Sequence, residues 1–270
     1  MTAIEPQLSS LGLIRPVSVE RPAHWRIALL LGIAGGIASM LLLPYALALL
    51  PDVARDIHIA LPLFAAAQAV QSAVLVTLLA WIGLRLGYAH GLDAPWLRRW
   101  VGGSPATIVP PARWGTAALL GAGVGVVVIA IQFVLPAVFP PGQSISVPNA
   151  WQGLLASFYG GIVEETICRL LLVSLFVWIG ARLARSTPAA GIYVAAIVFA
   201  ALLFGAAHLP ALAHMHAFTP AAALTVVLLN AICGCAFGWL FWHRGLEHAM
   251  LAHFCTDIVL HVFAPLAGSH

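Results

Sequence analysis

Three ionisable residues stand close together in a strongly apolar stretch of the chain. Glu164 and Glu165 are adjacent, and Arg169 follows four residues after the second glutamate. Residues i and i+4 share one face of an α-helix, so Glu165 and Arg169 can form an ion pair. Glu164 is rotated from Glu165 by about 100° and points elsewhere. The spacing therefore predicts one glutamate neutralised by the arginine and a second glutamate that stays available for chemistry.

Two later segments carry histidines at helical spacing. Phe204-Gly-Ala-Ala-His208 ends one apolar run, and His253-Phe-Cys-Thr-Asp257 places a histidine and an aspartate one helical turn apart in another. A carboxylate one turn from an imidazole can orient the ring. Ionisable groups inside a membrane are costly and face the interior of a helix bundle or a wet cavity. We therefore expect these groups to meet Glu164 at one site.

The composition indicates which elements must position these groups. The 270 residues are 62% hydrophobic and 8% charged, whereas an average soluble domain has roughly 25% charged residues. This much apolar surface predicts an integral membrane protein. The apolar runs are continuous rather than alternating, which favours an all-α polytopic helix bundle over a barrel. The small net charge and dispersed arginines do not indicate nucleic-acid binding, and the four cysteines fit buried packing residues.

Seven runs are long enough to span a bilayer, which takes about 20 residues. The predicted spans are 26–50, 59–84, 115–138, 151–181, 188–208, 221–242 and 247–266. Residues 1–25 are expected to form an N-terminal tail, and 26–270 a single transmembrane domain. A short interfacial helix is expected at 96–100. The pairs Gly32/Gly36 and Gly121/Gly125 predict close helix packing.

The arginines predict an orientation. Ten of the twelve fall in the tail or in links that a seven-span chain places on one side, and only Arg55 falls on the other. Basic residues are enriched on the cytoplasmic side of membrane proteins. We therefore expect a cytoplasmic N-terminus and an external C-terminus.

The three motifs in this order resemble the CPBP family, also called Abi proteins, which includes CAAX prenyl endopeptidases and bacteriocin-processing enzymes. The family pattern is E-E-x-x-x-R, then F-x-x-x-H, then H-x-x-x-N or D, each on a separate transmembrane helix. The chain has Glu164-Glu165-Thr-Ile-Cys-Arg169 and the two histidine segments quoted above. The stretch "GWLFWHRGLEHAMLAH" (238–253) is also similar. The resemblance covers about residues 150–262.

The resemblance implies an intramembrane endopeptidase, placed in a bacterial inner membrane. Its partners would be the lipid bilayer and a peptide or membrane-protein substrate of the prenylated or leader type. By position, Glu164 would activate water, His208 would help hold that water, and His253 and Asp257 would stabilise the oxyanion. The supporting residues carried over by position are Glu165, Arg169 and Phe204.

Position 257 departs from the commonest form of the family, which has asparagine there. Asparagine can donate a hydrogen bond to an oxyanion, whereas an ionised aspartate cannot. Asp257 is therefore protonated, or accepts from His253, or binds a metal. Glu164, His208, His253 and Asp257 would make a nitrogen–oxygen set that suits zinc. They would equally suit a metal-free, glutamate-activated water, and both routes stay open.

Two other classes of function fit the same residues. Intramembrane acids and histidines also mark ion paths, so a proton or divalent-metal transporter is an alternative. His214 and His216 lie near His208 in the sequence and would help to collect a cation. A membrane immunity or interaction protein without catalysis is the other alternative.

Overall fold

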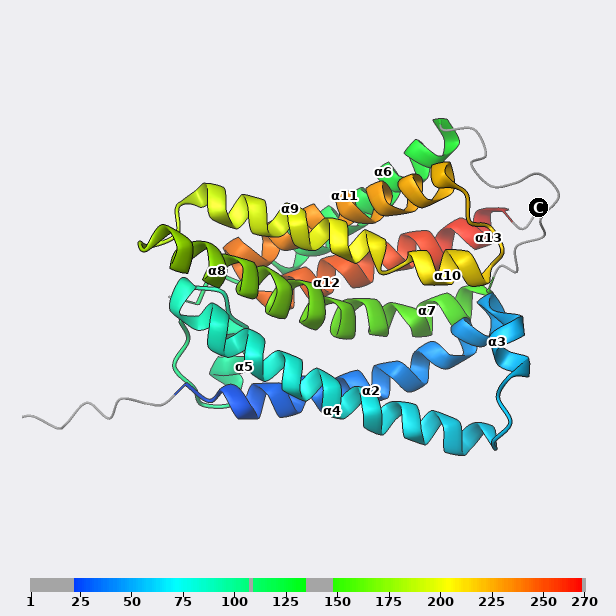
Figure 1. Ribbon diagram of the computed structural model, residues 1–270, viewed down its shortest axis with the longest axis horizontal. Helices are drawn as coiled ribbons and strands as arrows, with labels where there is room; N and C mark the ends of the chain where they lie inside the picture. Colours follow the sequence, from blue (N-terminus) through cyan, green and yellow to red (C-terminus); the bar gives the residue numbers. More distant parts are fainter. Residues whose placement is uncertain (1–21, 107–108, 135–147, 269–270) are drawn as a thin grey trace, which may run out of the picture.

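The computed structural model describes residues 22–106, 109–134 and 148–268, and every regular element within these ranges is helical (Figure 1). The elements are α2 (His24–Leu49), α3 (Pro51–Arg55), α4 (Leu61–Gly87), η1 (Tyr88–His90), α5 (Pro95–Trp100), α6 (Trp114–Val134), α7 (Ala150–Tyr159), η2 (Gly160–Glu164), η3 (Thr166–Val173), α8 (Ser174–Ala184), α9 (Ala190–Ala206), α10 (Leu209–His214), α11 (Pro220–Arg244), α12 (Leu246–Asp257), η4 (Ile258–Phe263) and α13 (Ala264–Gly268). Of the η elements, η1 is a 3₁₀-helix and η2, η3 and η4 are π-helices.

Within the described ranges, seven continuous helical segments are long and apolar enough to cross a membrane. They are His24–Leu49, Leu61–His90, Trp114–Phe133, Ala150–Ala184, Ala190–His214, Pro220–Arg244 and Leu246–Ala267. The all-α class and the seven spans predicted from the sequence are thereby confirmed, and α5 lies where the interfacial helix was expected. Residues 1–21 of the expected tail and residues 135–138 of the third predicted span lie outside the described residues.

Close helix packing depends on glycines at the predicted positions. Helix α2 packs on α4, and α6 packs on α12. A Cβ atom at Gly36 would lie 2.8 Å from the backbone oxygen of Ala69, and one at Gly121 would overlap the backbone oxygen of Ala252. Small residues let transmembrane helices approach this closely. The packing role expected for the two glycine pairs is therefore present.

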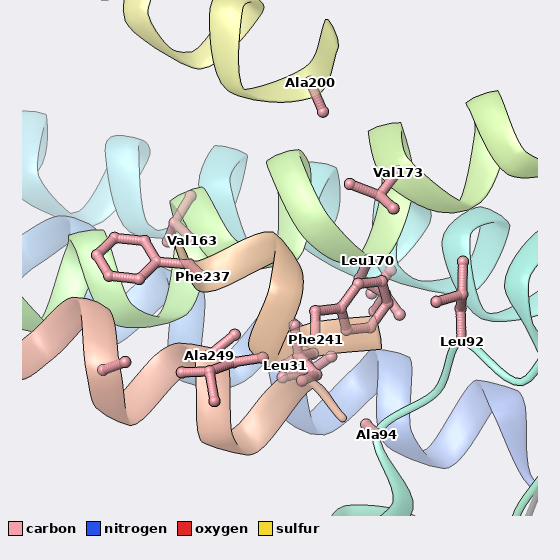
Figure 2. Close-up of a cluster of buried hydrophobic side chains, with 14 of the residues drawn as sticks. Leu31, Leu92, Ala94, Val163, Leu170, Val173, Ala200, Phe237, Phe241 and Ala249 are labelled. Atoms are coloured by element: carbon pink, nitrogen blue, oxygen red, sulfur yellow. The ribbon is translucent and has the colours of Figure 1, made fainter. Parts of the chain in front are cut away.

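Most of the interior of the bundle is apolar, and so is much of its outer surface. Figure 2 shows the core, to which α2 contributes Leu31, η3 contributes Leu170 and α11 contributes Phe241, all of them buried. Leu119 and Phe133 of α6 are exposed, at 76% and 86% of their surface. Lipid tails are as apolar as leucine, so the core of a membrane bundle is held by close packing rather than by removal from water.

A polar cap closes one end of the bundle. Figure 1 shows the start of α2, α5 and the end of α8 at this end, and α3, α10 and α13 at the other. Arg98 of α5 donates to both carboxylate oxygens of Asp93 at 2.7 and 2.6 Å, and both residues are buried. The Leu97 amide donates to Glu247 Oε1 at 2.7 Å. These bonds tie α5 to the start of α12, the helix that carries His253 and Asp257.

Candidate active site

Glu165 is the buried centre of the polar groups inside the bundle. Its Oε1 lies 3.0 Å from Arg169 Nη1 and 2.7 Å from His253 Nδ1. The three side chains are almost completely buried. The ion pair expected from the i, i+4 spacing is therefore present, and the same oxygen also binds a histidine from another helix.

The sequence led us to expect that Asp257 orients His253, but in the structure Glu165 does so. The Nδ1–Oε1 distance to Glu165 is 2.7 Å, whereas Nε2 lies 3.6 Å from Asp257 Oδ1. A separation of 3.6 Å is too long for a hydrogen bond. Since a carboxylate only accepts, Nδ1 carries the donated proton, and Nε2 faces Glu164 Oε2 at 3.7 Å. Phe237 stacks on the ring with centroids 4.7 Å apart, which fixes its plane.

Arg169 is held by charge and by aromatic faces. Its guanidinium lies 4.8 Å from the ring centroid of Phe204 and 5.2 Å from that of Phe237. Cations are attracted to the faces of aromatic rings, more strongly where water is excluded. Neither Nη atom of Arg169 makes a well-aligned hydrogen bond within the described residues. The contact between Arg169 and Glu165 is therefore an ion pair, defined by the 3.0 Å distance between Nη1 and Oε1. The ring of Phe204 also meets His208 edge-on at 4.9 Å and His253 at 5.7 Å.

A cavity of about 440 Å³ lies in front of this buried group. Glu164, His208, His253 and Asp257 line it, whereas Glu165 and Arg169 lie behind it. The side chain of Glu164 is 27% exposed. Most of the remaining wall is apolar, including Leu42, Leu49, Leu50, Val128, Leu229 and Leu260. A mostly apolar cavity with a few convergent polar groups is the usual form of a substrate site.

The cavity extends towards the end of the bundle opposite the polar cap. Its lining includes Leu49 and Leu50 at the end of α2 and Ala211 of α10. Figure 1 shows α10 and the end of α2 on the side away from α5. The cavity therefore extends towards the end that carries Arg55 rather than towards the end that carries most arginines.

The glutamates lie in widened helical turns rather than in a regular α-helix. Glu164 ends the π-helix η2, Glu165 joins it to the π-helix η3, and the π-helix η4 begins directly after Asp257. Such turns are rare and occur often at functional sites. A Cβ at Gly160 would overlap the Asp257 carboxylate and lie 3.0 Å from His253 Nε2. Glycine at this position lets α12 approach the glutamates.

His208 stands just after α9. Its Nδ1 lies 2.9 Å from the backbone oxygen of Phe204, which can only accept, so Nδ1 donates the proton. The neutral ring then presents Nε2 as a hydrogen-bond acceptor. His214 and His216 are exposed and do not line this cavity, and His216 lies 3.3 Å from Asp52 of α3. His214 and His216 therefore do not join His208 at the cavity, as the transporter alternative would require.

The segment that carries the two glutamates, Arg169, His208, His253 and Asp257 matches a family of membrane enzymes. Residues 146–259 match the family described as Type II CAAX prenyl endopeptidase Rce1-like. The chain carries an Rce1-like domain. The resemblance drawn from the three motifs is thereby confirmed, and the chain is an integral membrane protein with a CAAX-type protease domain. No curated protein and no solved structure matches the chain.

The described residues of the cavity do not form a metal site. In the part of the chain that the structure describes, no three His, Cys, Asp or Glu side chains are placed to hold a metal ion. The nitrogen Nδ1 of His253 is occupied by Glu165. Glu164, His208, His253 and Asp257 share a cavity without converging as a zinc set, so we assign no step to a metal.

The cavity is also lined by polar residues that the sequence did not single out. They are Tyr45, Gln132, Tyr159, Asn230 and His261. Tyr45 and Gln132 lie on α2 and α6, outside the matched segment. Tyr45 and Gln132 are isolated polar residues in apolar runs, so no spacing pattern could mark them, whereas His261 follows Asp257 by four residues, a helical spacing that could have marked it. Only helix packing brings Tyr45 and Gln132 to the site.

Proposed function

We propose that the Rce1-like domain is an active intramembrane endopeptidase in which Glu164 activates a water molecule for attack on a peptide bond. One observation carries this proposal. The partly exposed carboxylate of Glu164 lies in the cavity 3.7 Å from Nε2 of a histidine whose other nitrogen is fixed by Glu165. A free base beside an oriented imidazole is an arrangement that supports hydrolysis by water.

In the proposed reaction, Glu164 takes a proton from a water molecule while the water oxygen attacks the carbonyl carbon. Nε2 of His208 is suited to accept a hydrogen bond from the other O–H of that water, which keeps this proton. The developing oxyanion needs donors. His253 supplies one from Nε2 when both ring nitrogens carry protons, its charge being balanced by Glu165, and Asp257 supplies another when it is protonated. Glu164 then passes its proton to the leaving amine, and the peptide bond breaks.

Burial of the Glu165–Arg169 pair behind the cavity gives the two glutamates different roles. Glu165 already binds an arginine and a histidine, so it is unsuited to act as the base. Glu164 makes no such short contact, and its position on the cavity wall leaves it accessible to water. The adjacent acids thus divide into one that shapes the site and one that reacts.

Reconstituted protein can test this proposal with two synthetic peptides. One ends in a farnesylated cysteine, two aliphatic residues and a final residue, and the other is an unprenylated membrane-inserting leader peptide. We expect wild type to cleave at least one of them and Glu164→Gln to lose about 10²- to 10⁴-fold in rate, the usual contribution of a general base. Asp52→Asn, in an exposed ion pair on α3, is the matched control and should keep the rate. Equal cleavage by wild type and Glu164→Gln would contradict the proposal.

Two further experiments test whether hydrolysis needs a metal and whether the protein is a transporter instead. Because the described side chains do not assemble a metal site, we expect activity to survive complete chelation, with metal content measured on the same sample. Loss of cleavage that returns on adding zinc would contradict this. We also expect proteoliposomes to show no proton or zinc flux above that of empty vesicles. Flux that depends on Glu164, without cleavage, would favour the transporter.

A further inference from the structure

We propose that Tyr45 and His261 form a second polar contact for the substrate, binding an acyl oxygen two to three residues away from the scissile bond. This assignment rests on the proposed peptide hydrolysis. The acyl oxygen is either a backbone carbonyl or a C-terminal carboxylate, which present the same acceptor chemistry.

The two side chains form a pair on the cavity wall. The Tyr45 hydroxyl lies 3.3 Å from His261 Nδ1, and the rings meet edge-on with centroids 5.5 Å apart. Both residues line the same cavity as Glu164. They come from α2 and η4 and are 216 positions apart in the chain. Neither lies within the segment 146–259 that matches the family.

The pair keeps one hydrogen-bond donor unused in either tautomer. If the Tyr45 hydroxyl donates to Nδ1, the neutral His261 ring carries its proton on Nε2 and can donate from there. If Nδ1 donates to the tyrosine oxygen, the hydroxyl proton of Tyr45 is left to donate. The pair thus offers an uncharged donor, which suits an acyl oxygen.

The distance from the catalytic groups corresponds to a few residues of extended peptide. Gly153 of α7 packs against the backbone of His261, whereas Gly160 packs against Asp257 and His253. The seven-residue separation of these glycines corresponds to about 10 Å along a helix. An extended chain advances about 3.3–3.6 Å per residue, so this gap equals roughly three residues.

The surrounding wall explains why a substrate needs this contact. Around Tyr45, the other residues that α2 and its C-cap contribute to the cavity are apolar, namely Leu42, Ala46, Leu49 and Leu50. A peptide oxygen placed against such a wall loses its hydrogen bonds to water and must regain one from the protein. The Tyr45–His261 pair is placed to supply that bond, and it makes helix α2 part of substrate recognition.

The test compares Tyr45→Phe and His261→Gln with Tyr193→Phe. Tyr193 is a matched control because its hydroxyl also makes one hydrogen bond, to the backbone oxygen of His90, but outside the cavity. The probe is the farnesylated peptide with three residues after the cysteine, made as a C-terminal acid and as an amide. We measure kcat and KM in proteoliposomes, and the Kd of each peptide for the same variants in a Glu164→Gln background.

We expect Tyr45→Phe and His261→Gln to raise KM and Kd by about five- to tenfold with kcat unchanged, the scale of one lost hydrogen bond. Tyr193→Phe should leave both constants unchanged. If KM and Kd rise only for the acid peptide, the acyl oxygen bound by the pair is that of the C-terminal carboxylate. If they rise equally for the acid and the amide, the bound oxygen is a backbone carbonyl.

Three results separate this inference from the proposed function. If wild type binds the peptide without cleaving it, the hydrolytic function fails for that peptide, but a Kd weakened by Tyr45→Phe still supports the pair. If Tyr45→Phe and His261→Gln match Tyr193→Phe in both KM and Kd, the pair is structural and the inference is overturned. The same conclusion follows if neither peptide form binds to wild type.

Discussion

At the scale of single residues, one oxygen atom of Glu165 holds both Arg169 and His253. The other oxygen, Oε2, has no hydrogen-bond partner within the described residues. The orientation of the imidazole therefore depends on a carboxylate whose charge is balanced mainly by one arginine. Arg169 in turn lies between the rings of Phe204 and Phe237, which ties the motif on η3 to those on α9 and α11.

Removing the arginine should expose this dependence. Arg169→Met leaves a buried carboxylate without its cation, and breaking a buried pair in this way costs about 3–5 kcal/mol. We expect a matching loss of unfolding free energy in detergent, measured by chemical denaturation. Adding Glu165→Gln to Arg169→Met should recover part of the stability but not the cleavage, because His253 loses its charged partner. Wild-type stability of Arg169→Met would contradict the role of the pair.

The chemical form of Asp257 can be tested by one isosteric change. If Asp257 acts as a donor to the oxyanion, Asp257→Asn keeps a donor in the same place. We expect Asp257→Asn to retain kcat within about tenfold and Asp257→Leu to lose about 10²- to 10³-fold, the effect of removing one oxyanion donor. If Asp257→Asn is as inactive as Asp257→Leu, the carboxylate acts as an acceptor or as a ligand instead.

At the scale of helices, the site depends on where α7, its π-turns and α12 meet. Gly160 stands at the start of η2 with its α-carbon against Asp257 and His253. The π-helices η2, η3 and η4 surround this contact, so the local geometry differs from that of two regular helices. The position of α12 is also fixed at its far end, where Glu247 binds the backbone of α5.

A single methyl group at this contact should disturb the site. Gly160→Ala places a Cβ on the Asp257 carboxylate, and a displacement of about 1 Å at a catalytic group can cost about 100-fold in rate. Gly123→Ala on α6 is the matched control, because its Cβ would meet nothing within 4 Å. We expect Gly160→Ala to lose cleavage and Gly123→Ala to keep it, with the helical circular dichroism of both unchanged. Full activity of Gly160→Ala would show that α12 need not approach so closely.

At the scale of the whole molecule, the arginine-rich polar cap lies at one end of the helix bundle and the cavity extends towards the other. The polar cap around α5 carries Arg98 in its buried pair with Asp93, and the cavity extends towards the end with α3 and α10. If the arginine-rich end is cytoplasmic, as the distribution of basic residues predicts, substrate enters the cavity from outside the cell.

Reporter fusions test this orientation. We expect a phosphatase fused after residue 270 to be active, because it would lie outside the cytoplasm, and a fluorescent protein fused at the N-terminus to fold in the cytoplasm. The matched internal fusions are after residue 104, expected to be cytoplasmic, and after residue 58, expected to be external. A cytoplasmic C-terminal reporter would reverse the direction in which substrate reaches Glu164.

The sequence determined the features that depend on neighbours along the chain. Apolar runs of sufficient length predicted the seven spans, because lipid requires each crossing segment to satisfy its own backbone. The four-residue spacing predicted the Glu165–Arg169 pair, which forms even though the turn around it is π-helical. The order of the three motifs indicated the family, although each motif alone is short.

Only the tertiary structure decided which groups meet across helices. Glu165 rather than Asp257 orients His253 from 88 positions away, and Tyr45 reaches His261 from 216 positions away. The metal-ligand set considered from the sequence does not converge within the described residues, although its members share one cavity. Periodicity fixes which side chains share a face of one helix, but the approach of two helices depends on small residues at their contact, such as Gly160 against α12.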